Sequence, residues 1–179
     1  DPARGLVAVE QSPYAEIRVL DTPDGKSRLL VIDGGVHTIA DRATWESRYP
    51  YVRLIGLARC FKPRPGKLAL VGLGGGSVVK DFASQGWTVD AVEIDPVVVK
   101  LAREHFGLAA SEGSIHTMDG RRFLKTRPQT WDVIAMDAFG SSSIPFHLVT
   151  AEAFGLIASR LDPGGILAIN VESVGWQGK

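Results

Sequence analysis

The sequence predicts an α/β protein in which a small antiparallel β appendage precedes a doubly wound, mostly parallel sheet. From Lys67 onward, short apolar runs alternate with helical stretches that begin near Ser77, Pro96, Gly120 and His147. Strands that alternate with helices pair in parallel through right-handed crossovers. Ligands of such sheets bind at the carboxyl ends of the strands. The residues that follow each apolar run are therefore the candidate site residues.

The N-terminal region has a different pattern. The runs "YAEIRVLD" and "SRLLVID" flank "TPDGK", in which Asp24 and Gly25 mark a tight turn between two strands. The run "GGVHTIA" predicts a third short strand. A sheet this small is not stable by itself. We therefore expect residues 1–44 to pack on the main domain or on a neighbouring subunit.

A connecting helix is predicted from Trp45 to Phe61, because Val52, Ile55 and Ala58 recur on one helical face. The prolines of "KPRPGK" end it. This pattern divides the chain into three regions: an N-terminal β region (1–44), a connecting helix and linker (45–66), and an α/β domain (67–179). The chain begins without Met and stops just after a strand-like run, so we expect the α/β domain to be truncated at its C-terminus.

Composition excludes several classes of function. The chain has 179 residues, with 20 Lys and Arg and 20 Asp and Glu, so a zero formal charge gives no case for a nucleic-acid or membrane partner. It has no membrane-length apolar run, no signal-like N-terminus and a single cysteine, Cys60, which together predict a cytoplasmic protein. The four histidines lie in separate elements, so we expect surface or capping roles and no metal site.

A glycine cluster follows the first strand of the α/β domain. Gly72, Gly74 and Gly76 have the spacing of a bend that directs backbone N–H groups and a helix N-terminus at a ligand. The dinucleotide fingerprint requires its third glycine at position 77, where this chain has Ser77. A dinucleotide, an adenosyl sulfonium compound and a bend with no ligand all remain open at this point.

Acidic residues follow the next strands. Glu93 stands about 20 residues beyond the glycines, the spacing at which an acid binds ribose hydroxyls. Asp95, before Pro96, is interpreted as a helix cap. Asp119 either accepts from an adenine amino group or caps a helix. Asp137 either acts as a general base or cation ligand, or caps a turn. This combination points to an adenosine site.

At this point the chain resembles the spermidine synthase (polyamine aminopropyltransferase) family, which has the Rossmann-like fold of S-adenosylmethionine-dependent methyltransferases. The resemblance covers nearly the whole chain, including "LLVIDGGVHTIAD", "GLGGGS", "VEIDPVVVKLAREHFG", "MDGRRFL", "WDVIAMDAF" and "LDPGGILAINVES". It implies a donor, S-adenosylmethionine or its decarboxylated form, a small-molecule amine acceptor, and a homodimer formed through the N-terminal strands. It implies no metal, nucleic acid or membrane.

The resemblance also implies roles for individual residues. The donor's adenosyl part would lie at residues 72–76 and Glu93, and its adenine at Asp119 and Gly120. Asp137 matches the family's catalytic aspartate. Tyr51 matches the tyrosine of a Tyr-His-Glu motif that binds substrate, although an alignment on Trp45 is open.

The chain departs from the family at three positions. Gly75 replaces an aspartate that holds the amino end of the decarboxylated donor, and Gly140 replaces a second acid. Arg53 replaces an acid of the Tyr-His-Glu motif if Tyr51 is its tyrosine, and a cation there would repel a polyamine. Burying an ammonium group without a carboxylate costs several kcal/mol, on the order of the ion's desolvation penalty. Without an acid at position 75 an intact methionine carboxylate is easier to accommodate, so the donor is open. Together the departures indicate a changed amine acceptor.

Three functions follow from these observations. The first is transfer of an aminopropyl group to an amine, with Asp137 as the base, and the second is transfer of methyl from S-adenosylmethionine. The third is a non-catalytic nucleoside-binding module. A nicotinamide oxidoreductase, which rests only on the glycines and Glu93, is disfavoured by Ser77.

Overall fold

The C-terminal part of the chain forms a five-stranded sheet in which every strand pairs in parallel, in the order β7-β6-β5-β8-β9. The computed structural model describes residues 5–138 and 145–171. The strands are β5 (Lys67–Val71), β6 (Thr88–Glu93), β7 (Ser114–Thr117), β8 (Trp131–Met136) and β9 (Leu161–Ile169). The predicted doubly wound sheet is confirmed, and its strand order reverses between β5 and β8.

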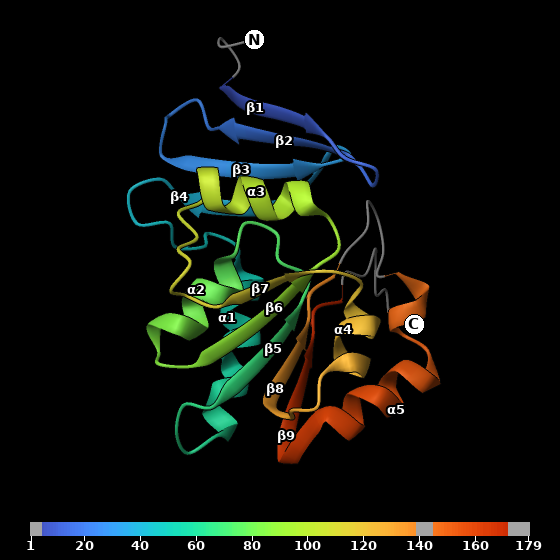
Figure 1. Cartoon of the computed structure of the whole chain (residues 1–179). Helices are drawn as coiled ribbons and strands as arrows, with labels where there is room; N and C mark the ends of the chain where they lie inside the picture. Colours follow the sequence, from blue (N-terminus) through green and yellow to red (C-terminus); the bar gives the residue numbers. More distant parts are fainter. Residues whose placement is uncertain (1–4, 139–144, 172–179) are drawn as a thin grey trace, which may run out of the picture.

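Helices cover both faces of this sheet, as Figure 1 shows. Two buried clusters, one on each face, pack the helices onto the strands. One face carries α1 (Pro50–Gly56), the 3-10 helix η2 (Leu57–Phe61), α2 (Ser77–Ser84) and α3 (Pro96–His105). The other carries α4 (Gly120–Thr126) and α5 (Ala151–Arg160), with the short 3-10 turn η3 (Phe146–Leu148) before α5. The carboxyl ends of the strands are left open to a ligand.

The N-terminal region forms an antiparallel sheet in the order β1-β2-β3-β4. Its strands are β1 (Leu6–Gln11), β2 (Glu16–Asp21), β3 (Ser27–Ile32) and β4 (Gly35–Asp41). Ile17 and Leu30 pack against Leu101 and Phe106, so α3 lies between the two sheets (Figure 1). Packing on the main domain, one of the two expected solutions, is thus confirmed. The sequence pattern missed β1, whose side chains are only partly buried.

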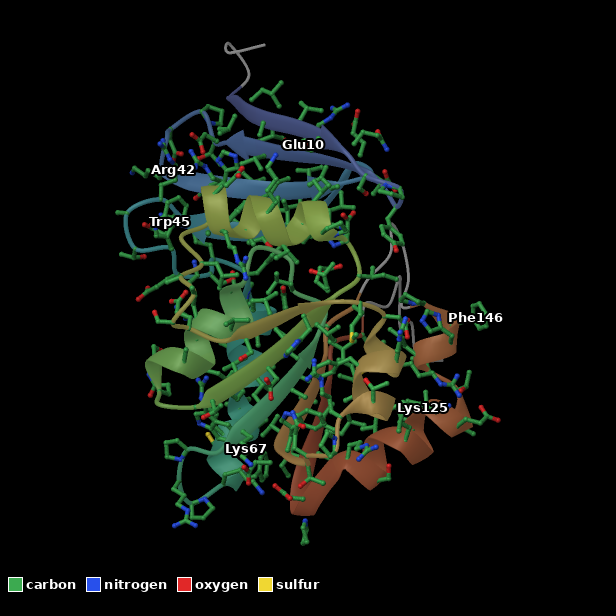
Figure 2. The ribbon with its side chains drawn as sticks, viewed as in Figure 1. Glu10, Arg42, Trp45, Lys67, Lys125 and Phe146 are labelled. Carbon is green, nitrogen blue, oxygen red and sulfur yellow. The ribbon has the colours of Figure 1, made fainter. Side chains whose placement is uncertain are left out.

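The predicted helix from Trp45 to Phe61 begins later than expected. Pro50 is its first residue, since proline is well tolerated there, and the segment before it is not helical. Trp45 has a left-handed backbone with φ of 60°, and Ser47 pairs with Ala40 as an isolated bridge. Trp45 lies beside the N-terminal sheet (Figure 2), with its ring centroid 6.5 Å from that of Phe106. Packing against Phe106 overrides the helical pattern here.

Two other boundaries differ from prediction. The helix expected near His147 is divided into η3 and α5, because the side chain of Thr150 caps α5 by accepting from the Ala153 N–H. The last strand begins at Leu161, ahead of the predicted apolar run. Its register with β8 shifts between Trp131 and Val133, so a bulge accommodates Pro163 at the edge of the sheet. Within the described residues, no helix is long and apolar enough to cross a membrane.

Candidate active site

A cavity of about 870 Å³ lies at the carboxyl ends of the parallel strands, where the strand order reverses. Its other wall comes from β4 and the start of α1, so both sheets contribute to it. Four carboxylates line it, and no Lys or Arg is among its described lining residues. The carboxylates belong to Glu93, Asp95, Asp119 and Asp137. The cavity is therefore suited to a ligand that carries positive charge.

The glycine bend forms the floor between β5 and α2, where Gly72 and Gly74 line the cavity. Gly72 has φ of +95°, and a Cβ atom at this position would stand 2.3 Å from the carbonyl oxygen of Asp137. Only glycine permits that approach. This close packing at Gly72 allows the Asp137 N–H to donate to the Val71 carbonyl at 2.7 Å, and it places Asp137 beside the bend.

Gly75 and Gly76 are not among the residues that line the cavity. The Gly75 N–H donates to Thr38 Oγ1 at 2.8 Å, and a Cβ atom would stand 2.7 Å from Thr38 Cγ2 and 3.0 Å from Phe106 Cδ1. Position 75 therefore lies behind the bend, against β4 and α3. The structure gives no support to the idea that a side chain here sets the charge next to a ligand.

Glu93 ends β6 and is held entirely by backbone groups. Its Oε2 accepts from the Leu73 N–H at 3.0 Å, and its Oε1 accepts from the Asp95 N–H at 3.0 Å. Burial raises the pKa of Glu93 above its ordinary value, although these backbone hydrogen bonds oppose the rise. Asp95 is confirmed as the cap of α3, accepting from the Val97 N–H at 2.8 Å.

Asp119 and Gly120 lie where β7 leads into α4, and both line the cavity. Asp119 caps α4 because its Oδ1 accepts from the Arg122 N–H at 2.8 Å. Its Oδ2 lies 3.1 Å from Nε2 of His147. The sequence left a choice between a cap and a ligand contact, but one carboxylate can serve both, since each oxygen accepts more than one hydrogen bond.

Asp137 follows β8 and contacts two side chains from distant parts of the chain. Its Oδ1 accepts from Asn170 Nδ2 at 2.9 Å, and Tyr51 on the first turn of α1 also hydrogen-bonds to it. Burial raises the pKa of Asp137 to about 6, and these two hydrogen bonds reduce the rise. Burial and the nearby Asp137 raise the pKa of Tyr51, so its hydroxyl stays protonated and donates. Asp137 can therefore accept a proton near neutral pH.

Sequence reasoning missed several residues of the cavity. Asn170 directly follows β9 and His147 lies in η3, and both line the cavity. The position of Asn170 after a strand was an available signal, whereas His147 was expected only at a surface or as a cap. The Tyr49 hydroxyl donates to the Val36 carbonyl at 3.2 Å and joins α1 to β4.

No group of three or more metal-ligating side chains occurs among the described residues. Gly140, one of the three predicted departures from the family, lies outside the residues that the structure describes.

A comparison with protein families agrees with this geometry. The family model described as spermine/spermidine synthase domain matches residues 48–177. The chain belongs to the spermine/spermidine synthase family. The matched segment contains α1, the glycine bend and the three carboxylates Glu93, Asp119 and Asp137. The resemblance seen in the sequence is thus confirmed.

Curated relatives of this family cover almost all of the chain. It is 37% identical to a polyamine aminopropyltransferase of Vibrio vulnificus over 178 residues, which span 94% of the chain and 60% of the relative. It is 27% identical to spermidine synthase 1 of Pisum sativum over 173 residues, 92% of the chain and 50% of the relative. The chain therefore spans only about half to three fifths of the length of these spermidine synthase-like relatives.

Solved structures confirm the fold. A probable spermidine synthase from Corynebacterium glutamicum superposes with a TM-score of 0.82 at 21% identity, over 92% of this chain and 63% of that one. Human methyltransferase-like protein 13, solved with S-adenosylhomocysteine, superposes with a TM-score of 0.60 at 24% identity, over 66% of this chain and 63% of that one. Family and fold thus agree on a methyltransferase-like α/β domain with an N-terminal β sheet.

Proposed function

We propose that the cavity is an aminopropyltransferase centre that moves an aminopropyl group from decarboxylated S-adenosylmethionine to an amine. The observation that carries the proposal is Asp137, a buried carboxylate whose pKa is raised to about 6. It lies at the point in the sheet where α/β folds bind their ligands. The names of the relatives, polyamine aminopropyltransferase and spermidine synthase, supply the reaction.

The donor's adenosyl part fits the wall formed by the ends of β5, β6 and β7. The backbone at Gly72 and Gly74 leaves space for close approach, and Glu93 accepts hydrogen bonds from both ribose hydroxyls. Asp119 accepts from the adenine amino group, and Gly120 lies beside it. Backbone N–H groups fix both oxygens of Glu93 and one oxygen of Asp119, which limits the rearrangement that binding requires.

The transfer itself requires alignment and one proton acceptor. The acceptor's amine nitrogen attacks the aminopropyl carbon bonded to the sulfonium, the carbon–sulfur bond breaks, and its electron pair returns to sulfur to give methylthioadenosine. Only a neutral amine can attack, so Asp137 takes a proton from the acceptor nitrogen as the new bond forms and then passes that proton to solvent. Tyr51 and Asn170 hold the Asp137 carboxylate in place for this step.

The charge of the cavity favours the decarboxylated donor. Intact S-adenosylmethionine carries an additional carboxylate, and no Lys or Arg of the described lining is present to pair with it. Four lining carboxylates would repel it instead. The decarboxylated form presents only its sulfonium and ammonium charges, which these carboxylates attract.

Calorimetric titration of the chain with each donor tests the proposal. We expect the decarboxylated donor to bind at least about tenfold more tightly, a difference of about 1.4 kcal/mol. Incubation of the bound chain with a panel of mono-, di- and triamines should then give aminopropylated product and methylthioadenosine by mass spectrometry. A methylated product would establish methyl transfer instead. Binding without product would indicate a nucleoside-binding module, and binding of neither donor would contradict the site itself.

A further inference from the structure

His147 contacts the cavity carboxylate to which the proposal above assigns the adenine. Its Nε2 lies 3.1 Å from Asp119 Oδ2, while Asp119 Oδ1 accepts from the Arg122 N–H at 2.8 Å. Both side chains line the cavity and are partly exposed, with exposed fractions of 39% for His147 and 35% for Asp119. An ionised carboxylate only accepts hydrogen bonds, so this contact requires the His147 tautomer or cation that carries a proton on Nε2. Each Asp119 oxygen then has one donor and retains capacity for another.

The turn η3 fixes the place of His147. Leu148 is 5% exposed and anchors the turn in the core under α4 and α5, whereas Phe146 is 81% exposed and stands away from the ribbon in Figure 2. The guanidinium of Arg121 lies 3.4 Å from the His147 carbonyl oxygen and joins the turn to α4. His147 is thus held between a buried and an exposed neighbour, with its ring toward Asp119.

We propose that His147 is a positioning residue that orients the Asp119 carboxylate and thereby makes the cavity selective for 6-aminopurines over 6-oxopurines. The inference rests on the proposed adenosyl site. The Arg122 N–H holds Oδ1 of Asp119, and a His147 Nε2–H that donates to Oδ2 holds the other oxygen. With both oxygens held, the carboxylate cannot rotate about its Cβ–Cγ bond. A 6-amino group donates to the fixed carboxylate. A 6-carbonyl oxygen placed there brings two acceptors together with no proton between them, so that base is rejected.

Binding of a matched pair of ligands tests this selectivity. Methylthioadenosine and methylthioinosine differ in the 6-substituent and the N1 proton. Calorimetry with the wild-type chain should show clear preference for methylthioadenosine. His147→Ala should weaken methylthioadenosine binding about tenfold, the equivalent of one hydrogen bond to a charged group, and leave methylthioinosine binding nearly unchanged. His147→Gln, whose amide nitrogen can reach the position of Nε2, should restore most of the preference.

Val149→Ala is the matched control, because it alters the end of the same turn at an exposed side chain that does not line the cavity, whereas the Phe146 ring packs against that of His147. It should leave both affinities unchanged. If His147→Ala weakened the binding of both ligands by the same factor, His147 would have a merely structural role. If it changed neither affinity, His147 would have no role in binding. Either result overturns the inference. A wild-type chain that binds neither methylthioadenosine nor the donor would instead contradict the proposed function.

A double-mutant cycle checks that His147 acts through Asp119. Asparagine is as good a helix cap as aspartate, so Asp119→Asn keeps the start of α4. If His147 only orients the carboxylate, His147→Ala should have little further effect on methylthioadenosine affinity in the Asp119→Asn background. A full, additive tenfold loss in the double variant would mean that His147 acts independently, and would overturn the inference.

Discussion

Two walls of the cavity hold their carboxylates in different ways. In the backbone-held wall, which comprises Glu93 and Asp119 at the ends of β6 and β7, main-chain N–H groups donate to each carboxylate. In the side-chain-held wall, Asp137 accepts from Asn170 and Tyr51, which come from β9's end and from α1. The first wall is built from local turns. The second requires three distant segments to meet.

The two walls differ in how far their hydrogen-bond donors can move. In both walls burial raises the pKa of the carboxylate, for Glu93 and for Asp137, and the hydrogen bonds to each oppose that rise. A main-chain N–H cannot move away from its acceptor without refolding the turn. Backbone donors therefore fix both oxygens of Glu93 and one oxygen of Asp119, whose other oxygen contacts His147. A tyrosine hydroxyl and an asparagine amide can follow a carboxylate as it gains and loses a proton. Binding therefore suits the first wall and proton transfer suits the second.

The largest expected effect separates these two tasks. Asp137→Asn should lower turnover by about 10²- to 10⁴-fold, the range for loss of a general base, with the donor dissociation constant changed by less than about threefold. Glu93→Gln is the matched variant in the other wall. It should weaken donor binding about tenfold or more, because a charged acceptor of two ribose hydroxyls becomes neutral. Single-turnover product formation and calorimetry measure the two quantities.

The pH profile sharpens the same comparison. With the pKa of Asp137 at about 6, kcat/KM of the wild-type chain should rise as pH increases through about 6, because the carboxylate must be ionised to accept the proton. The residual activity of Asp137→Asn should show no such rise of kcat/KM near pH 6. A limb that persists unchanged in the variant would assign the titration to another group and remove Asp137 as the base.

The next effect concerns stability. Because the pKa of folded Asp137 is raised from 3.8 to about 6, the folded state binds the proton more tightly than the unfolded chain. The stabilising contribution is complete below pH 4 and is lost as pH rises through 6. The cost of the ionised carboxylate at pH 8 is about 3 kcal/mol. Asp137→Asn should therefore raise the free energy of unfolding at pH 8 by up to about that amount.

Urea denaturation at pH 4 and pH 8 measures this difference. At pH 4 the wild-type aspartate is protonated in the folded state, so the variant should gain little there. Glu10→Gln is a suitable control, since Glu10 pairs with Lys100 in an exposed ion pair that contributes little. An equal gain at both pH values would show that the buried charge is not its cause.

The contrast between local turns and contacts of distant segments also decides what the sequence could predict. Glu93, Asp119 and Asp137 were found because each follows an apolar run, and the chain's alternation of strands and helices brings such positions to one edge. The alternation that predicted parallel pairing and the α3 cap at Asp95 are equally local signals. These are features that neighbouring residues determine, and the sequence contains that information.

Contacts between distant segments could not be predicted in this way. The place of Asn170 after an apolar run could have put it at the same edge, but nothing near it in the sequence shows that its amide meets Asp137. The late start of α1 depends on Trp45, which packs on Phe106 instead of continuing a helical pattern. His147 was expected to be a surface or capping residue, since its partner Asp119 stands 28 positions earlier in the chain. Tertiary packing, which periodicity does not encode, determines these features.

Gly75 is a further instance, and it gives the smallest expected effect. The resemblance to the family indicated that a missing aspartate here changes the charge next to the donor. In the structure, position 75 instead faces Thr38 and Phe106. Gly75→Ala should therefore destabilise the fold by about 1 to 2 kcal/mol through overpacking. It should leave the ratio of affinities for the two donors unchanged.

Thr38→Ser supplies the test of the overpacking explanation. It removes Cγ2, the atom 2.7 Å from the added methyl group, and keeps the Oγ1 that accepts from the Gly75 N–H. In the Gly75→Ala background it should recover part of the lost stability in urea denaturation, whereas in the wild-type chain it should be neutral or slightly destabilising. A Gly75→Asp chain that prefers the decarboxylated donor tenfold more strongly would place this side chain at the ligand after all.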